Sequence, residues 1–146
     1  MRADPCPALQ PKVATNCSRF TTPQCGLLET PWGGNTVRTG TFGTAGDGLD
    51  VITTSAQLNS VFAAAGQVKV VTSMFGVCNA AGGVLGCGRS GASLIITTGA
   101  AADVWIHEWG HVRGLGHNDT DVRYIMHSTA PNTDSVTKAE CVKFKP

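Results

Sequence analysis

The most informative stretch of the sequence is His107-Glu108-Trp109-Gly110-His111-Val112-Arg113-Gly114-Leu115-Gly116-His117. On a helix, positions i and i+4 stack on one face, so His107 and His111 point the same way about one turn apart. Glu108 lies about 100° around the helix from His107, within reach of a water on a metal held by these rings. The spacing therefore predicts a helix that carries two metal ligands with a carboxylate beside them.

A third histidine on the same straight helix would stand at position 114 or 115, but Gly114 occupies the first of these positions. Glycine tolerates a positive φ and commonly ends a helix. We therefore expect the chain to turn at Gly114 and to bring His117 back to the metal from a loop. Three neutral imidazoles leave the fourth position of a tetrahedral Zn²⁺ open for water, as in a catalytic site. The alternatives are a structural metal site, which has no need of Glu108, and surface histidines with ordinary polar partners.

With these residues in place, the sequence resembles the metzincin clan of zinc endopeptidases, whose long zinc motif matches residues 107–117 at every fixed position. The clan also has a Met-turn, a tight turn with a methionine beneath the zinc-binding histidines, and Met126 in Tyr124-Ile125-Met126-His127 resembles it. The resemblance implies a zincin-like α/β (α+β) fold, in which helices and an active-site helix pack against a mixed sheet. It also implies an upper subdomain of about 1–117 and a small C-terminal lower subdomain of about 118–146, with zinc in the cleft between them.

Two positions depart from the known subfamilies. Ser128 stands where astacin-like and serralysin-like members carry a tyrosine that can bind or leave the zinc, and Asn118 after the third histidine matches no subfamily cleanly. Short bacterial or fungal secreted metzincins are the nearest comparison. We therefore expect the site to work with three histidines, one catalytic Zn²⁺ ion and Glu108 as the general base.

The resemblance implies a zinc-dependent endopeptidase that hydrolyses peptide bonds of proteins and binds its substrate in extended form. An edge strand of the sheet would pair with that substrate, and the candidate is 92–97 or its neighbouring loop. The alternative is an ordinary protected edge. Two alternatives stay open: a zinc amidase that acts on a non-protein amide, and a non-catalytic, disulfide-stapled binding or toxin domain. The presence of Glu108 argues against the second alternative.

Size and charge narrow the class of protein. The 146 residues predict one domain, 1–146, long enough to bury about two-thirds of its unfolded surface. A formal net charge of +1, with no basic run, gives no electrostatic basis for binding nucleic acid or an acidic membrane surface. Because no apolar stretch approaches 18 residues, we expect no membrane span. We expect a monomer whose only partner is its protein or peptide substrate.

The six cysteines form an even set without paired C-x-x-C spacing. This pattern predicts a disulfide framework and a secreted, extracellular protein. The expected pairs are Cys78–Cys87, Cys17–Cys25 and Cys6–Cys141. Cys6 has an alternative role as a latency cysteine that occupies the open zinc position, but the even count favours a disulfide.

Calcium is a second possible ion. The candidate oxygen ligands are scattered along the chain: Asp47, Asp50, Asp119, Asp121 and Asp134. Their spacing matches no EF-hand loop, so we interpret them as surface carboxylates.

Hydrophobic periodicity and breaker residues predict an alternation of strands and helices, typical of a mixed sheet with helices packed against it. We expect strands at 37–42, 49–53, 67–75 and 92–97, with a turn at 43–48 and a glycine-rich excursion at 77–91. We expect helices at 55–65 with Ser55 as N-cap and Gly66 as the stop, at 100–113 with Thr97 or Thr98 as N-cap, and near the end of 134–146. A capping box from Thr137 to Glu140 would begin this last helix.

Overall fold

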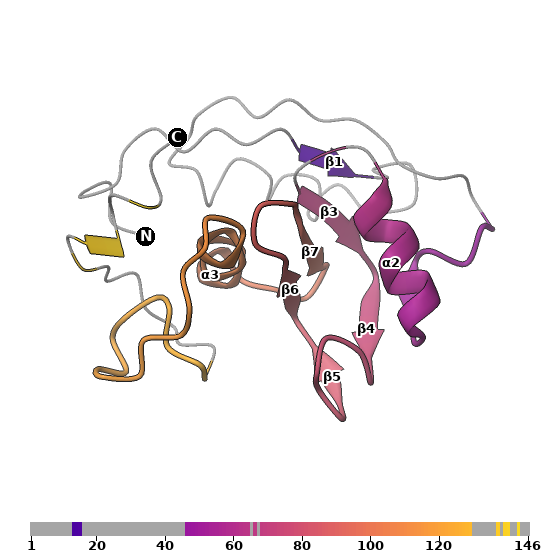
Figure 1. Ribbon diagram of the computed structural model, residues 1–146. Helices are drawn as coiled ribbons and strands as arrows, with labels where there is room; N and C mark the ends of the chain where they lie inside the picture. Colours follow the sequence, from indigo (N-terminus) through magenta and orange to yellow (C-terminus); the bar gives the residue numbers. More distant parts are fainter. Residues whose placement is uncertain are drawn as a thin grey trace.

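The computed structural model describes residues 13–15, 46–64, 66, 68–129, 137, 139–140 and 143. Among these residues, two helices and two small mixed sheets form a mixed α and β fold, as the sequence predicts (Figure 1). The first sheet has the strand order β1-β3-β7-β6, and the second has the order β2-β4-β5. The helices are α2 (Ser55–Ala63) and α3 (Ala102–Val112).

The first sheet forms the centre of the fold. Its strand β3 (Val68–Val71) pairs in parallel with β1 (Val13–Thr15) and with β7 (Leu94–Thr97), and β6 (Gly86–Gly88) runs antiparallel to β7. Every residue of β3 and β7 is buried, which is typical of strands covered on both faces. Leu94 and Ile96 face the core that contains α3, whereas Ile95 faces the core that contains α2. The sheet therefore lies between the two helices (Figure 1).

Helix α3 is anchored by large apolar side chains. Trp105, Ile106 and Trp109 are buried and belong to the apolar cluster that includes residues of β3 and β7. The expected N-cap is wrong, because Ala101 holds that position without a side-chain hydrogen bond. Thr97 ends β7 instead, and the Thr98 hydroxyl donates to the backbone oxygen of Thr72 at 3.2 Å.

The predicted helix 55–65 is present as α2, but its cap also differs. The side chain of Thr54 accepts a hydrogen bond from the backbone N–H of Gln57, and the side chain of Gln57 accepts one from the backbone N–H of Thr54. This reciprocal capping box moves the cap one residue before Ser55. The helix ends at Ala63 with Ala64 as its C-cap, two residues before Gly66.

The predicted strand 67–75 is wrong as a single strand. It divides into β3 and β4 (Ser73–Phe75), which belong to different sheets. The reason is a hydrogen bond at 2.8 Å from the backbone N–H of Thr72 to the oxygen of Asp50, which draws the chain toward the strand after Asp50. β4 then pairs in parallel with β2 (Val51–Ile52), at the centre of the expected strand 49–53, and antiparallel with β5 (Gly83–Val84).

The segment 92–97 is not an edge strand, but its neighbouring loop supplies one. The segment 92–97 forms β7, which lies between β3 and β6 and so has both edges paired. Within the described part of this sheet, β6 is the terminal strand, and it contacts α3. β6 arises inside the segment 77–91, which the sequence predicted only as a glycine-rich excursion.

One disulfide and one capping box agree with the sequence predictions. Cys78 and Cys87 form the expected disulfide. The N–H of Glu140 donates to the Thr137 hydroxyl at 3.1 Å and the N–H of Thr137 donates to the Glu140 carboxylate at 2.8 Å, which confirms the capping box. The strand 37–42 and the pairs Cys17–Cys25 and Cys6–Cys141 lie outside the described residues. No helix in the described ranges is both long and apolar enough to cross a membrane.

Candidate metal centre

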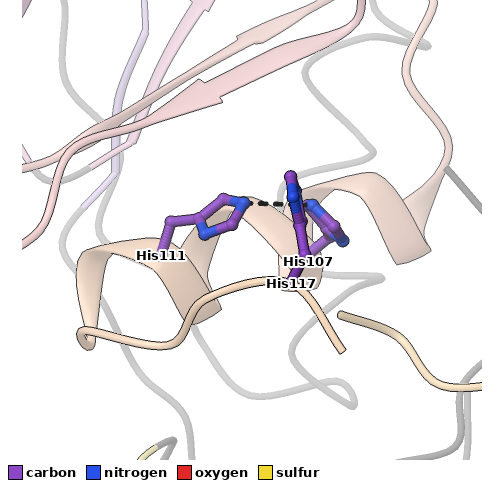
Figure 2. Close-up of side chains that lie close together, drawn as sticks. All are labelled: His107, His111 and His117. Carbon is purple, nitrogen blue, oxygen red and sulfur yellow. Dashed lines mark hydrogen bonds between the residues drawn. The ribbon is translucent and has the colours of Figure 1, made fainter. Parts of the chain in front are cut away.

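Two of the predicted ligands lie on α3. His107 and His111 project from the same face of the helix, as their spacing predicts, and their ring centroids are 4.8 Å apart (Figure 2). Their Nε2 atoms approach to 3.2 Å. Two nitrogens bound to one tetrahedral Zn²⁺ at 2.0–2.1 Å lie about 3.3 Å apart, so this spacing fits such an ion.

The third histidine comes from the loop after α3. Gly114 adopts a φ of 85°, in the left-handed region that favours glycine, and the chain reverses there as the sequence predicts. The ring centroid of His117 then lies 5.4 Å from that of His107 and 4.9 Å from that of His111. One nitrogen from each of the three rings lies within 4.8 Å of the others, an arrangement that could hold a metal ion.

Backbone carbonyls set the orientation of both helical histidines. Nδ1 of His107 donates to the oxygen of Ile125 at 2.6 Å, and Nδ1 of His111 donates to the oxygen of Leu115 at 2.8 Å. With the proton held on Nδ1, the lone pair of each Nε2 points toward the shared space. Burial lowers the pKa of both rings, so the neutral form that binds a metal is favoured.

Glu108 lies beside the three rings. Its side chain lines the same cleft of about 580 Å³ as His107, His111 and His117. Burial raises the pKa of this carboxyl to about 7, and a hydrogen bond from the backbone N–H of Gly88 opposes part of that rise. A carboxyl that titrates near neutral pH can both accept and return a proton, which suits a general base.

Strand β6 presses its backbone against α3 at this point. A Cβ at Gly88 would lie 2.5 Å from the backbone oxygen of Glu108 and 3.0 Å from the Cβ of His111. Only a residue without a side chain permits this approach. Gly86 and Gly88 are not among the site residues predicted from the sequence, although both flank Cys87 there.

Met126 lies in a tight turn that packs against the apolar cluster of helix α3. The N–H of His127 donates to the oxygen of Tyr124 at 3.0 Å, which closes the turn. Met126 is fully buried, in the same apolar cluster as Trp109. Its backbone oxygen accepts a hydrogen bond from the N–H of Asn118 at 2.8 Å, so the turn is bonded to the residue that follows the third histidine.

A second contact holds this loop, and the sequence alone did not reveal it. The side-chain amide of Asn118 donates to the carboxylate of Glu140 at 2.8 Å, and Glu140 is buried. Asn118 therefore links the His117 loop to the capping box near the end of the chain. Because the two residues lie far apart in the sequence, no local pattern predicts this pair.

The candidate calcium ligands have other partners where they are described. The carboxylate of Asp121 pairs with Arg123 at 2.6 Å, and that of Asp119 accepts the N–H of Ser128 at 2.8 Å. Asp134 lies outside the described residues. Among the described residues, the three histidines are the one group arranged to hold a metal ion.

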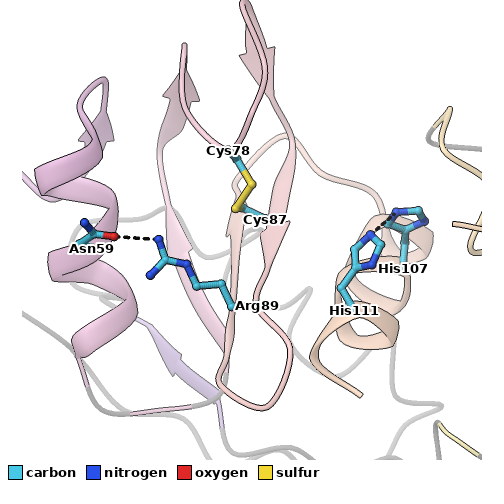
Figure 3. Close-up of a disulfide and its surroundings, with 6 residues drawn as sticks. All are labelled: Asn59, Cys78, Cys87, Arg89, His107 and His111. Carbon is cyan, nitrogen blue, oxygen red and sulfur yellow. Dashed lines mark hydrogen bonds between the residues drawn. A yellow bond between two sulfur atoms is a disulfide. The ribbon is translucent and has the colours of Figure 1, made fainter. Parts of the chain in front are cut away.

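The disulfide forms part of the same site. Cys87 is the central residue of β6, and Cys78 lines the cleft (Figure 3). The bond therefore connects the cleft wall to the strand that contacts Glu108.

Comparisons with known proteins give no relative. No protein-family model matches the chain, and neither a curated protein nor a solved structure is significantly similar to it. The case for a function therefore depends on the sequence motif and on the geometry of the cleft.

Proposed function

We propose that the protein is a secreted, zinc-dependent endopeptidase of the metzincin type, with a zincin-like fold. The observation that carries the proposal is the meeting of three histidine nitrogens within 4.8 Å in a cleft that Glu108 also lines. The histidine ligands and a nearby carboxylate are the groups that metal-assisted hydrolysis requires. The disulfide is compatible with an extracellular location.

In this proposal, His107, His111 and His117 hold the ion. When bound, zinc would lower the pKa of a water toward 7 and polarise the scissile carbonyl. The carboxylate of Glu108 accepts a proton from the attacking water and returns it to the nitrogen of the leaving amine. The position of Glu108 in the same cleft as the three histidines supports this role, because a general base must lie within reach of the proton that it accepts. Met126 supports the histidines and takes no part in the chemistry.

The test combines metal analysis with a peptide library. We expect the purified protein to contain about one zinc ion per chain and to cleave peptide bonds, and we expect a chelator to abolish cleavage. His117→Ala should lose the metal, whereas Glu108→Gln should retain it and lose at least about 99% of the cleavage rate, since general-base catalysis contributes roughly 10²–10⁴-fold.

A matched control is available in His127, the histidine of this chain that lies outside the metal group. His127→Ala should keep both the metal and the activity. Full peptidase activity in metal-loaded Glu108→Gln would refute the mechanism. Hydrolysis of small amides with no cleavage of peptides would favour the amidase alternative, and metal binding with no hydrolysis of either would favour the binding domain.

A further inference from the structure

Asp103 occupies a position in the cleft that the proposed mechanism does not use. It lies on α3 four residues before His107, which places it about 6 Å away along the helix axis and on the same face. Its side chain is partly exposed and lines the cleft together with the three histidines and Glu108. A substrate side chain next to the scissile bond would lie within reach of this carboxylate.

The Asp103 carboxylate is available for a ligand. No hydrogen bond or ion pair to its side chain is present among the described residues. A carboxylate on a cleft wall without a partner favours the approach of a positive charge. Apart from the histidines, Asp103 and Glu108 are the charged side chains among the described residues of this cleft, and both are acidic.

Arg89, which directly follows β6, does not neutralise this wall. The guanidinium of Arg89 donates to the side-chain oxygen of Asn59 at 2.7 Å and lies 3.9 Å from the centroid of the Phe62 ring. Figure 3 shows it turned toward α2, away from His107 and His111. The guanidinium of Arg89 therefore lies on the α2 side of the sheet, whereas the histidines lie on α3.

Apolar residues complete this part of the cleft. Val104 follows Asp103 on the helix, and Leu85 and Leu115 also line the space. Lysine and arginine side chains pack their apolar stems on such surfaces while their charged ends reach a carboxylate. A four-carbon lysine stem is long enough to span about one helical turn.

We propose that Asp103 makes the cleft select substrates that carry a lysine or arginine side chain next to the scissile bond. The inference rests on the proposed endopeptidase function and names the class of substrate that the site takes. Asp103 has one competing structural role, because an acidic residue in the first turn of α3 interacts favourably with the positive end of the helix. That role would affect stability and leave substrate preference unchanged.

The first experiment compares cleavage of two peptides that differ at one residue, lysine in one and its uncharged analogue norleucine in the other. The wild-type protein should show a kcat/KM about tenfold higher for the lysine peptide, the size expected for a hydrogen bond between charged groups. Asp103→Asn should lose most of this ratio by losing activity on the lysine peptide alone. Asp121→Asn removes an acidic side chain that does not line the cleft and should leave the ratio unchanged.

The second experiment measures binding without catalysis. Metal-loaded Glu108→Gln should bind the lysine peptide more tightly than the norleucine peptide, and addition of Asp103→Asn should make the two dissociation constants equal.

A wild-type protein that cleaves both peptides equally well would overturn the inference and leave the proposed function intact. A protein that cleaves neither peptide would overturn the proposed function. Equal binding of the lysine and norleucine peptides would then also overturn the recognition of a lysine side chain by Asp103. If Asp103→Asn lowered the unfolding temperature but left the ratios of kcat/KM and of the dissociation constants unchanged, the role of Asp103 would be to stabilise helix α3 only.

Discussion

Gly86 and Glu108 are in such close contact that a methyl group at Gly86 would lie 2.5 Å from Cγ of Glu108. Real Cβ atoms essentially never approach other atoms this closely, so any larger residue at position 86 must displace the carboxylate or the strand. The main chain of β6 therefore acts as a wall that fixes where the Glu108 side chain can lie.

We predict that Gly86→Ala slows catalysis without removing the metal. The added methyl would move the Glu108 carboxylate from its position, and misplacement of a catalytic group by about 1 Å can cost about a hundredfold in rate. Steady-state kinetics should show a kcat lowered about tenfold to a hundredfold with KM changed little, and metal analysis should show full zinc content. Gly82→Ala is the matched control, since a Cβ at Gly82 meets nothing within 4 Å. Equal kinetics for the two variants would contradict the prediction.

We predict that Met126 stabilises the fold and the metal centre together. Met126 is fully buried, so Met126→Ala should lower the free energy of unfolding by about 2–5 kcal/mol, measured by urea denaturation. The same variant should bind zinc more weakly, because the turn also places the carbonyl of Ile125 that orients His107. Met126→Leu, which nearly conserves volume, should cost less than about 1.5 kcal/mol and should keep the zinc affinity. Loss of stability in Met126→Ala with unchanged zinc affinity would separate the two effects and refute the coupling.

The raised pKa of Glu108 predicts that the metal-free protein loses stability as pH rises. The folded-state pKa of about 7 lies above the ordinary value of 4.5, so between these values the unfolded chain releases a proton that the native carboxyl retains. The contribution of Glu108 is present below about pH 4.5 and is lost as pH rises through 7. At about 1.4 kcal/mol per pH unit, the loss between pH 4.5 and pH 7 amounts to roughly 3–4 kcal/mol.

Glu108→Gln isolates this effect. In the presence of a chelator, the variant should be more stable than the wild type above pH 7, and the difference should vanish near pH 4.5. His107 and His111 have lowered pKa values, so their protonation destabilises the native state at acidic pH, but this contribution is shared by both proteins and cancels in the difference. Urea denaturation across this range gives the measurement, and a difference independent of pH would contradict the assignment.

We predict that the Cys78–Cys87 disulfide supports both stability and catalysis. The bond joins residues with a sequence separation of nine, for which the chain-entropy model gives about 2–3 kcal/mol. Replacing both cysteines with serine should lower the free energy of unfolding by this amount. Because Cys87 lies between the two glycines that contact α3, we also expect a lower kcat with zinc still bound. Unchanged kcat in a folded, zinc-loaded double variant would show that the disulfide acts on stability alone.

Much of the site was predictable because its determinants are local. The positions of His107 and His111 follow from the period of a helix, and the turn to His117 follows from the conformational freedom of Gly114. The Cys78–Cys87 pair was predictable because the two residues bracket a short loop. The prediction of secondary structure failed where a tertiary hydrogen bond decided it. At Thr72, the hydrogen bond to Asp50 divides one apolar run between two sheets.

By itself, then, the sequence determined the three histidines, the acid beside them and the mixed α and β class, since each depends on the spacing or composition of neighbouring residues. The tertiary structure alone decided which carbonyl orients His107, which strand contacts Glu108, and that Asp103 lines the cleft together with the histidines. These features join segments that are distant along the chain. Only the packing of α3 against the sheet and against the turn at Met126 brings such segments together, so no local pattern of residues could encode them.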